Sequence, residues 1–378
     1  MNIVEEYFKK MTDNISFIEL KENSYIDLKG YIIKDYLPLP IIIDTLVEEI
    51  QTGNLYDELN VKHLIDGIIY TIGVDLGFKY KNEYIKILYH YDKKIEDYIL
   101  YRGLKFAEDE NYDISAVYFR ALININSKNT IGIFNYALCL ENISKKFIEN
   151  KFVDKGEAFL LESANQLERI LDIDSEFSLA YYKLGYHYKY QGQFLKASLV
   201  WDKYLKLDRE EIRAEEIRKE LESIQDDVDF EQGVYHLNNQ EYDLALERFL
   251  KLIGKYEEWG YIYYLTGLAY KGNKEYEKAL NFLKKAMELD EYNVDIYNEL
   301  GICFYALGDF NGAINIFNRG INLNQEDYKT FFNRGMTYLE LGNIKEAMED
   351  ISTAYELNPS DTFVKNQKIY LENLLNLE

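Results

Sequence analysis

Helix-breaking residues are scarce in this chain of 378 residues. It has only three prolines, Pro38, Pro40 and Pro359, while aromatic residues make up 15% of it. Because proline breaks helix interiors, so low a content favours an all-α fold. The aromatic content also argues against disorder, since disordered segments are poor in aromatic side chains.

Long apolar runs and basic clusters are lacking too. No stretch of about 18 apolar residues occurs, so no membrane span is expected, and the acidic start Met-Asn-Ile-Val-Glu-Glu differs from a basic secretory signal. The formal net charge of −23 opposes nucleic acids and anionic membranes as partners. The first fifty residues hold five Lys or Arg against ten acids, which argues against a DNA-reading helix there. We therefore expect a cytoplasmic protein without nucleic-acid or membrane partners.

Motifs for catalysis, cofactors and metals are absent as well. The chain has no phosphate loop of the form G-x-x-x-x-G-K-[ST], no G-x-S-x-G elbow and no H-E-x-x-H pair. Its two cysteines, Cys139 and Cys303, are too few for a disulfide framework or a metal cluster, and its four histidines stand alone. The sequence thus predicts no enzyme activity, no cofactor and no metal site.

What the sequence does contain is an internal repeat of 34 residues. Glycine recurs at this spacing, alanine follows twelve residues after each glycine, and a large apolar residue follows four residues later. The glycines are Gly233, Gly267, Gly301 and Gly335, the alanines are Ala245, Ala279, Ala313 and Ala347, and the large residues are Phe249, Leu283, Phe317 and Ile351. Three registers kept over four repeats are hard to obtain by chance.

A period of 34 residues with this pattern resembles the tetratricopeptide repeat family. The resemblance implies a right-handed superhelical solenoid of helix-turn-helix units. In each unit, the glycine and the small residue twelve positions later would let the two helices approach closely.

The resemblance divides the chain into about seven repeats. They are expected at 96–129, 130–177, 178–211, 226–259, 260–293, 294–327 and 328–361. The second of them carries about 14 extra residues near 141–157, which we expect to lengthen both of its helices. Residues 212–225 are rich in helix-forming side chains and predict an extra helix.

The two ends of the chain differ from the repeats. Residues 362–378 fit a capping helix, which a solenoid needs because its last repeat has no neighbour. Residues 1–95 lack the period, and helices are expected at about 2–12, 40–52, 60–75 and 79–92. This helical N-terminal segment is either a cap or a small partner-specific domain. A degenerate repeat around Gly67 and Tyr70 could form part of the cap.

The resemblance also implies where a partner would bind. In this family the first helix of each repeat lines a concave face, which takes up a protein or peptide segment. The matching positions here are Tyr182, Lys183, Tyr186, Tyr190, Phe230, Tyr261, Tyr264, Leu268, Asn298, Tyr305, Phe332 and Asn333. Tyr182, Tyr186 and Tyr190 form one stripe along a helix, and the asparagines could bond a peptide backbone. The alternative is that the face packs against the N-terminal segment or only reflects the 36 tyrosines of the chain.

Three functions remain open from the sequence. The first is a scaffold or adaptor that binds a partner segment on the concave face. The others are a peptide-responsive regulator and a non-catalytic subunit of an enzyme complex. Co-chaperones in this family hold a carboxylate with a clamp of Lys and Asn, but the matching positions here carry Tyr182 and Tyr186, then Phe230 and Val234. A heat-shock chaperone carboxylate clamp is therefore not expected.

Overall fold

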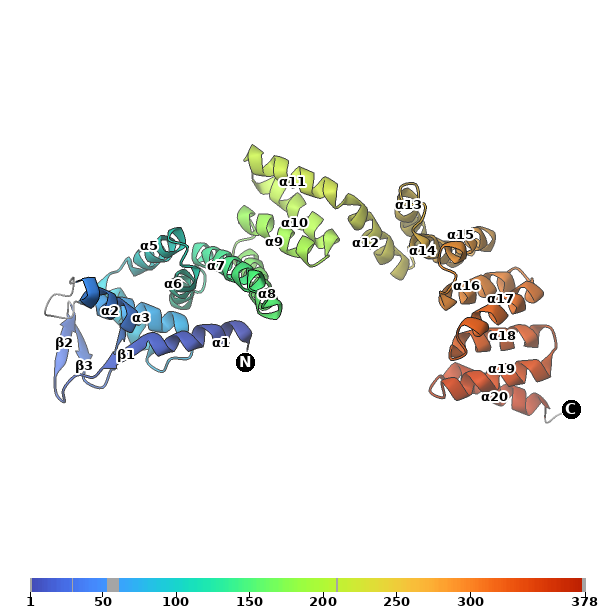
Figure 1. Cartoon of the computed structure of the whole chain (residues 1–378), viewed down its shortest axis with the longest axis horizontal. Coiled ribbons are helices and arrows are strands. Elements are labelled where there is room, and N and C mark those ends of the chain that lie inside the picture. Colours follow the sequence, from blue (N-terminus) through green and yellow to red (C-terminus); the bar gives the residue numbers. More distant parts are fainter. Residues whose placement is uncertain (1, 29, 53–60, 209, 376–378) are drawn as a thin grey trace. The chain divides into compact units, whose positions relative to one another are not determined.

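The computed structural model describes residues 2–28, 30–52, 61–208 and 210–375. The chain divides into two compact units, Met1–Arg218 and Lys219–Glu378. Both units consist mainly of helices that follow one another in pairs (Figure 1). The predicted solenoid of helical repeats is confirmed.

The N-terminal segment of the first unit combines helices with short strands. In chain order its elements are α1 (Ile3–Lys10), the 3-10 turn η1 (Met11–Asn14), β1 (Ile15–Ile18), β2 (Tyr25–Leu28), β3 (Tyr31–Lys34), β4 (Leu39–Ile42), α2 (Ile43–Thr52), α3 (Val61–Val74) and α4 (Lys81–Tyr91). The four helices lie at or close to the segments that the sequence predicted. Strand β1 pairs with β4 and strand β2 pairs with β3, both antiparallel.

The prediction of a helical N-terminal segment is wrong for residues 15–42. Pro40 lies in β4 opposite Phe17 of β1, a place where a residue without an N–H group is tolerated. Gly30, with φ of 90°, turns the chain between β2 and β3. Each strand has only four residues, so alternation of polar and apolar side chains is too short to stand out in the sequence.

The rest of the first unit is built from three helix pairs and a further helix. The pairs are α5 (Ile95–Glu108) with α6 (Tyr112–Ile125), α7 (Thr130–Glu149) with α8 (Val153–Ile173), and α9 (Ser178–Tyr190) with α10 (Phe194–Leu207). The insertion makes α7 20 and α8 21 residues long. The further helix, α11 (Glu211–Ser223), contains the boundary between the two units.

The second unit continues with four helix pairs and ends on one helix. The pairs are α12 (Gln225–Asn238) with α13 (Tyr242–Ile253), α14 (Gly260–Gly272) with α15 (Tyr276–Leu289), α16 (Val294–Ala306) with α17 (Phe310–Leu323), and α18 (Tyr328–Glu340) with α19 (Ile344–Leu357). Helix α20 (Thr362–Leu375) packs on α19 with its buried Leu371.

The repeated glycine is where the two helices of a pair come closest. A Cβ atom built on Gly301 would lie 2.2 Å from Cε1 of Phe317, sixteen residues later. The same conflict recurs between each glycine and the large residue of its own repeat, as in Gly103 with Phe119, Gly185 with Trp201, Gly233 with Phe249, Gly267 with Leu283 and Gly335 with Ile351. The repeated alanines are fully buried in the same contacts. Gly67 differs, because it lies against the backbone of Pro40 in β4.

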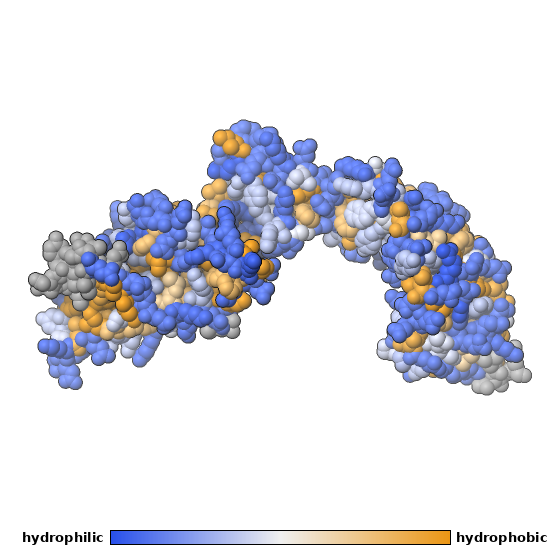
Figure 2. Space-filling view, in the orientation of Figure 1, coloured by the Kyte–Doolittle hydropathy of each residue, from blue (hydrophilic) through white to orange (hydrophobic). Residues whose placement is uncertain are grey.

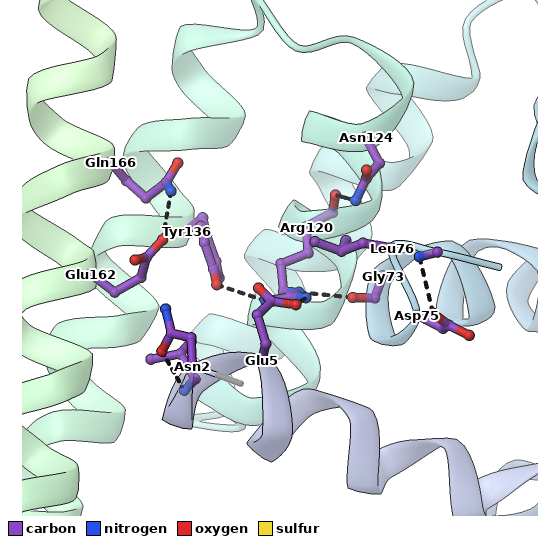
Figure 3. A network of polar contacts seen from close by, with 12 residues as sticks. Asn2, Glu5, Gly73, Asp75, Leu76, Arg120, Asn124, Tyr136, Glu162 and Gln166 are labelled. Carbon is purple, nitrogen blue, oxygen red and sulfur yellow. Dashed lines mark hydrogen bonds and ion pairs between the residues drawn. The ribbon is translucent and has the colours of Figure 1, made fainter.

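Helix α1 is attached to the first unit through Arg120 of α6, which is almost completely buried (Figure 3). Its Nε donates to the carbonyl oxygen of Gly73 at 2.8 Å, and Nη1 donates to the hydroxyl of Tyr136 at 3.1 Å. Both carboxylate oxygens of Glu5 accept bonds from the guanidinium, at 3.0 and 2.9 Å. The guanidinium also lies 4.3 Å from the ring centroid of Phe8. One side chain thus joins α1, α3, α6 and α7.

The surface of the chain is mainly hydrophilic, as its composition requires. Figure 2 shows hydrophilic residues over most of the visible face, with hydrophobic patches between them. Among the described residues, no helix combines the length and the hydropathy that crossing a bilayer demands.

Replacing Gly301 with alanine tests the close approach. We expect the Gly301→Ala variant to lose about 1–3 kcal/mol of unfolding free energy, as overpacked cores do. This loss should appear although alanine favours a helix over glycine by about 1 kcal/mol. Urea denaturation of the full chain, followed by circular dichroism, measures it.

The matched control for this variant is Gly254→Ala. Gly254 is the C-cap of α13 in the same unit, with φ of −61°, and the heavy atom nearest to a Cβ built on it is 3.5 Å away. This substitution should leave the stability unchanged or raise it slightly. Equal losses in the two variants would show that the glycine contact does not limit the helix spacing.

Replacing Arg120 with methionine tests the attachment of α1. In Arg120→Met, water can hydrate the partly exposed carboxylate of Glu5. We therefore expect this variant to lose about 2–3 kcal/mol of unfolding free energy, the range for hydrogen bonds to a charged group. Hydrogen exchange should also become faster in α1. Arg319, an exposed residue 5.1 Å from the ring of Tyr297, is the control, and Arg319→Met should cost less than about 1 kcal/mol. Unchanged exchange in α1 would refute the attachment.

Candidate functional site

A hollow of about 330 Å³ lies beside the predicted tyrosine stripe of α9. It is lined by Tyr182, Lys183, Tyr186 and Tyr190 of the predicted set, together with Glu141, Leu160 and His187. Its size is at the lower end of the range of ligand pockets, about 300–1,000 Å³. We name this hollow the α7–α9 groove.

The aromatic wall of this groove is held in place from α10. Gly185 leaves room for the ring of Trp201, whose Nε1 donates to the carbonyl oxygen of Tyr182 at 3.1 Å. The ring of Tyr186 meets that of Trp201 edge-on, with centroids 5.1 Å apart. The rings of Tyr182 and Tyr204 lie tilted to each other, with centroids 5.4 Å apart. The glycine that brings the helices together therefore also orients two tyrosines of the groove.

Helix α11 holds the hydroxyl ends of the same two tyrosines. The carboxylate of Glu216 accepts hydrogen bonds from Tyr182, at 3.1 Å, and from Tyr186. Burial raises the pKa of Tyr186 above its usual range, and the bond to Glu216 raises it further. The phenol therefore stays protonated and remains a donor. Tyr190, in contrast, is 61% exposed.

The polar part of the groove is an ion pair around Glu141. Lys183 Nζ lies 2.6 Å from its Oε2, and His187 Nε2 lies 3.0 Å from its Oε1. Burial by itself raises the pKa of Glu141, but the bonds from His187 and Lys183 outweigh it and hold the pKa below the usual range. Nδ1 of His187, a buried atom, has no hydrogen-bond partner.

Ser163 completes this cluster without making it catalytic. Its Oγ lies 3.3 Å from Nε2 of His187, the same nitrogen that Glu141 contacts. A nucleophilic triad needs the acid at one ring nitrogen and the nucleophile at the other. Ser163 is also fully buried and its Oγ donates to the carbonyl oxygen of Ala137 at 3.0 Å. The cluster is thus an internal polar network.

The other eight predicted site residues belong to the second unit. Phe230, Tyr261 and Tyr264 form ring contacts, at 6.3 Å between the first two and 6.1 Å between the last two. Asn333 Nδ2 donates to Oδ1 of Asn298 at 2.7 Å, so these two side-chain amides are hydrogen-bonded to each other.

The remaining three lie next to these residues along the repeats. Leu268 packs partly buried in the core of the α13–α14 region. The hydroxyl of Tyr305 donates to Glu340 at 3.2 Å, and Phe332 meets Phe363 of α20 at 5.4 Å. The predicted set is therefore two groups of residues, one in each unit.

Comparison with protein families now decides the identity of the repeats. Three tetratricopeptide repeat families match the chain, over residues 230–294, 271–331 and 328–361. Residues 230–361 are therefore tetratricopeptide repeats. No match was found among curated proteins.

Solved structures of tetratricopeptide repeat proteins are similar to parts of the chain. The first such domain of Spaghetti (RPAP3), bound to the HSP90 peptide SRMEEVD, is 23% identical, covers 31% of this chain and 93% of its own, and has a TM-score of 0.30. The tetratricopeptide repeat domain of Arabidopsis OM64 is 25% identical to this chain. The match covers 30% of this chain and 94% of the domain, with a TM-score of 0.29. YrrB, described as having an unusual peptide-binding site, is 18% identical to this chain. The match covers 66% of this chain and 97% of YrrB, with a TM-score of 0.28.

Three residues that line the groove, Glu141, Leu160 and His187, and the neighbouring Glu216 were missed by sequence reasoning. Glu141 lies four residues after Ala137, the position that matches the repeat glycine, so reading the repeat 130–177 with the others would have found it. Glu216 had no such signal, because α11 lies outside the period.

The described residues include no group of three or more His, Cys, Asp or Glu side chains placed to hold a metal ion. Cys139 and Cys303 are buried free thiols, and burial raises the pKa of each to about 12. Both thiols therefore stay protonated near neutral pH.

The lowered pKa of Glu141 predicts a pH-dependent stability. The folded state binds this proton less readily than the unfolded state, so the stabilisation is present above the ordinary pKa of 4.5 and disappears as pH falls through the lower folded value. We expect Glu141→Gln to lose about 1–3 kcal/mol of unfolding free energy at pH 7. The difference from the unsubstituted protein should shrink below the ordinary pKa.

Urea denaturation at several pH values measures this difference. The control is Glu149→Gln in the same helix, since Glu149 is 64% exposed and lies 4.0 Å from Lys145. Its effect should be small at every pH. A loss for Glu141→Gln that stays constant down to acid pH would rule out the ion pair as its source.

Proposed function

We propose that this tetratricopeptide repeat protein is a scaffold or adaptor that binds an extended segment of a partner protein. Repeats of this family are protein-interaction modules, and both units keep aromatic side chains on the matching helix faces. The α7–α9 groove is the observation that carries the proposal, because it joins an open hollow to a fixed aromatic wall. Tyrosine adds large contact area at low entropic cost.

The self-packing alternative has less support. Helix α1 makes its aromatic contacts with Phe147 and Phe159, at 5.6 and 5.2 Å from Tyr7, and with Tyr136. None of these residues lines the α7–α9 groove. The partner on this proposal is a protein or peptide, rather than a nucleic acid, a membrane or a chaperone carboxylate. Two buried free thiols favour a reducing compartment such as the cytoplasm.

A peptide-responsive regulator is the second candidate, supported by Glu216. Its carboxylate on α11 occupies the hydroxyls of Tyr182 and Tyr186. A segment that entered the groove and bonded these hydroxyls would release α11 from the tyrosines. Faster hydrogen exchange in α11 on binding would separate this candidate from a passive scaffold.

Removing Tyr190 tests the scaffold proposal. Tyr190 is exposed and makes no ring contact among the described residues, so Tyr190→Ala should fold normally. We expect a partner captured from source-cell lysate, and then purified, to bind this variant about tenfold more weakly, as loss of 1.4 kcal/mol at an interface tyrosine does. Fluorescence anisotropy of the labelled partner measures the dissociation constant.

The control is Tyr36→Ala, which removes a tyrosine that is 62% exposed in the N-terminal segment. It should bind the partner as the unsubstituted protein does. Binding that is equal for both variants would place the partner outside the groove.

A further inference from the structure

Five aromatic side chains follow one another in contact at the start of the second unit. Their order is Tyr256, Trp259, Phe230, Tyr261 and Tyr264, and successive ring centroids are 6.0, 4.9, 6.3 and 6.1 Å apart. They come from α12, α14 and the connection between α13 and α14. We name these residues the aromatic run.

Three members of the aromatic run are exposed although they are large. Tyr256 is 43%, Trp259 37% and Tyr261 49% exposed. Exposed groups of such side chains are typical of interaction surfaces, and Trp and Tyr are the residues most often central to them. Packing of the repeats does not account for them, since the core contact of this pair is made by Gly233 and Phe249.

Elsewhere in the chain, Lys and Arg side chains of the same chain lie over aromatic rings. Lys284 lies 5.5 Å from the centroid of Phe304, and Arg334 lies 5.6 Å from that of Phe331. Within the part of the chain that the structure describes, no Lys or Arg side chain makes such a contact with the five rings of the aromatic run. These rings therefore offer faces on which a cation from outside can lie.

Carboxylates border the run on two helices. Asp226 of α12 accepts a hydrogen bond from the hydroxyl of Tyr256 at 2.8 Å and is also paired with Lys255, at 2.6 Å. On the other side, burial raises the pKa of Tyr264, and the charges of Glu299 and Asp295 on α16 raise it further. Glu299 is paired with Lys271, which leaves Asp295 as the exposed charge of the two. Asp295 thus places a negative charge near Tyr264.

We propose that the aromatic run binds arginine side chains of an extended basic segment of the partner. This inference rests on the proposed function, because it names the chemistry of the segment that the repeats take up. A guanidinium is planar and weakly hydrated, so it stacks on Trp and Tyr faces better than an ammonium does. The net charge of −23 attracts such a segment over longer distances.

The probe is a fluorescein-labelled peptide with three arginines separated by Gly-Ser, and its partner probe has citrulline in place of each arginine. Citrulline keeps the shape of the side chain and removes its charge. We expect fluorescence anisotropy with the full chain to show at least tenfold weaker binding of the citrulline peptide. Tyr261→Leu and Trp259→Leu should each weaken binding of the arginine peptide about fivefold.

The matched control is Tyr292→Leu, since Tyr292 is 75% exposed in the same unit and is not part of the run. It should leave the affinity unchanged. Circular dichroism checks that each variant is folded, and Asp295→Asn, which keeps every ring, should weaken binding about threefold.

Two results would overturn the inference. One is equal binding of the arginine and citrulline peptides. The other is equal affinity of the Tyr261→Leu and Tyr292→Leu variants, which would mean attraction by net charge alone. If the purified partner binds through Tyr190 while the arginine peptide fails to bind, the scaffold proposal stands and this inference falls. If the arginine peptide binds as expected and no partner depends on Tyr190, the run is a binding site and the groove proposal falls.

Discussion

The contact between a repeat glycine and the large residue sixteen positions later sets the geometry on which the other features depend. Where a Cβ atom would lie between 2.0 and 2.9 Å from that side chain, as at Gly185 and Gly335, only glycine allows the helices to approach so closely. The buried alanine on the facing helix serves the same end. In α9 this approach brings Trp201 under Tyr182 and Tyr186. A packing constraint therefore also fixes part of the candidate binding surface.

That constraint explains why the repeats were visible in the sequence. A glycine, an alanine and a large residue at fixed spacing leave a record that does not depend on distant partners. The strands β1 to β4 left none, because four residues are too few for a period. The attachment of α1 was invisible for another reason, since Arg120 and Glu5 are 115 residues apart. Glu216 likewise lies outside the period, and the tyrosine that it bonds is 30 residues away.

In the first unit, buried charged side chains join helices that belong to different pairs. Arg120 is bonded to Glu5, Gly73 and Tyr136, and Glu141 is bonded to Lys183 and His187. Buried charges are tolerated when their bonds are complete, and both groups lie between helices of different pairs. In the second unit, Asp229 pairs with Arg248 and Arg334 with Asp350 within single repeats, and Lys271 pairs with Glu299 of the following repeat. Ion pairs thus stabilise contacts both within and between helix pairs.

Tyrosine and carboxylate, both abundant here, act together. The hydroxyls of Tyr182 and Tyr186 bond to Glu216, that of Tyr188 to Glu168, that of Tyr256 to Asp226 and that of Tyr305 to Glu340. Each bond satisfies the phenol, fixes the plane of the ring and places a negative charge at its edge. The face of an oriented ring attracts cations, as the ring of Tyr188 does with Lys196 at 5.5 Å. The proposed basic protein segment matches this combination of an acidic composition and 36 tyrosines.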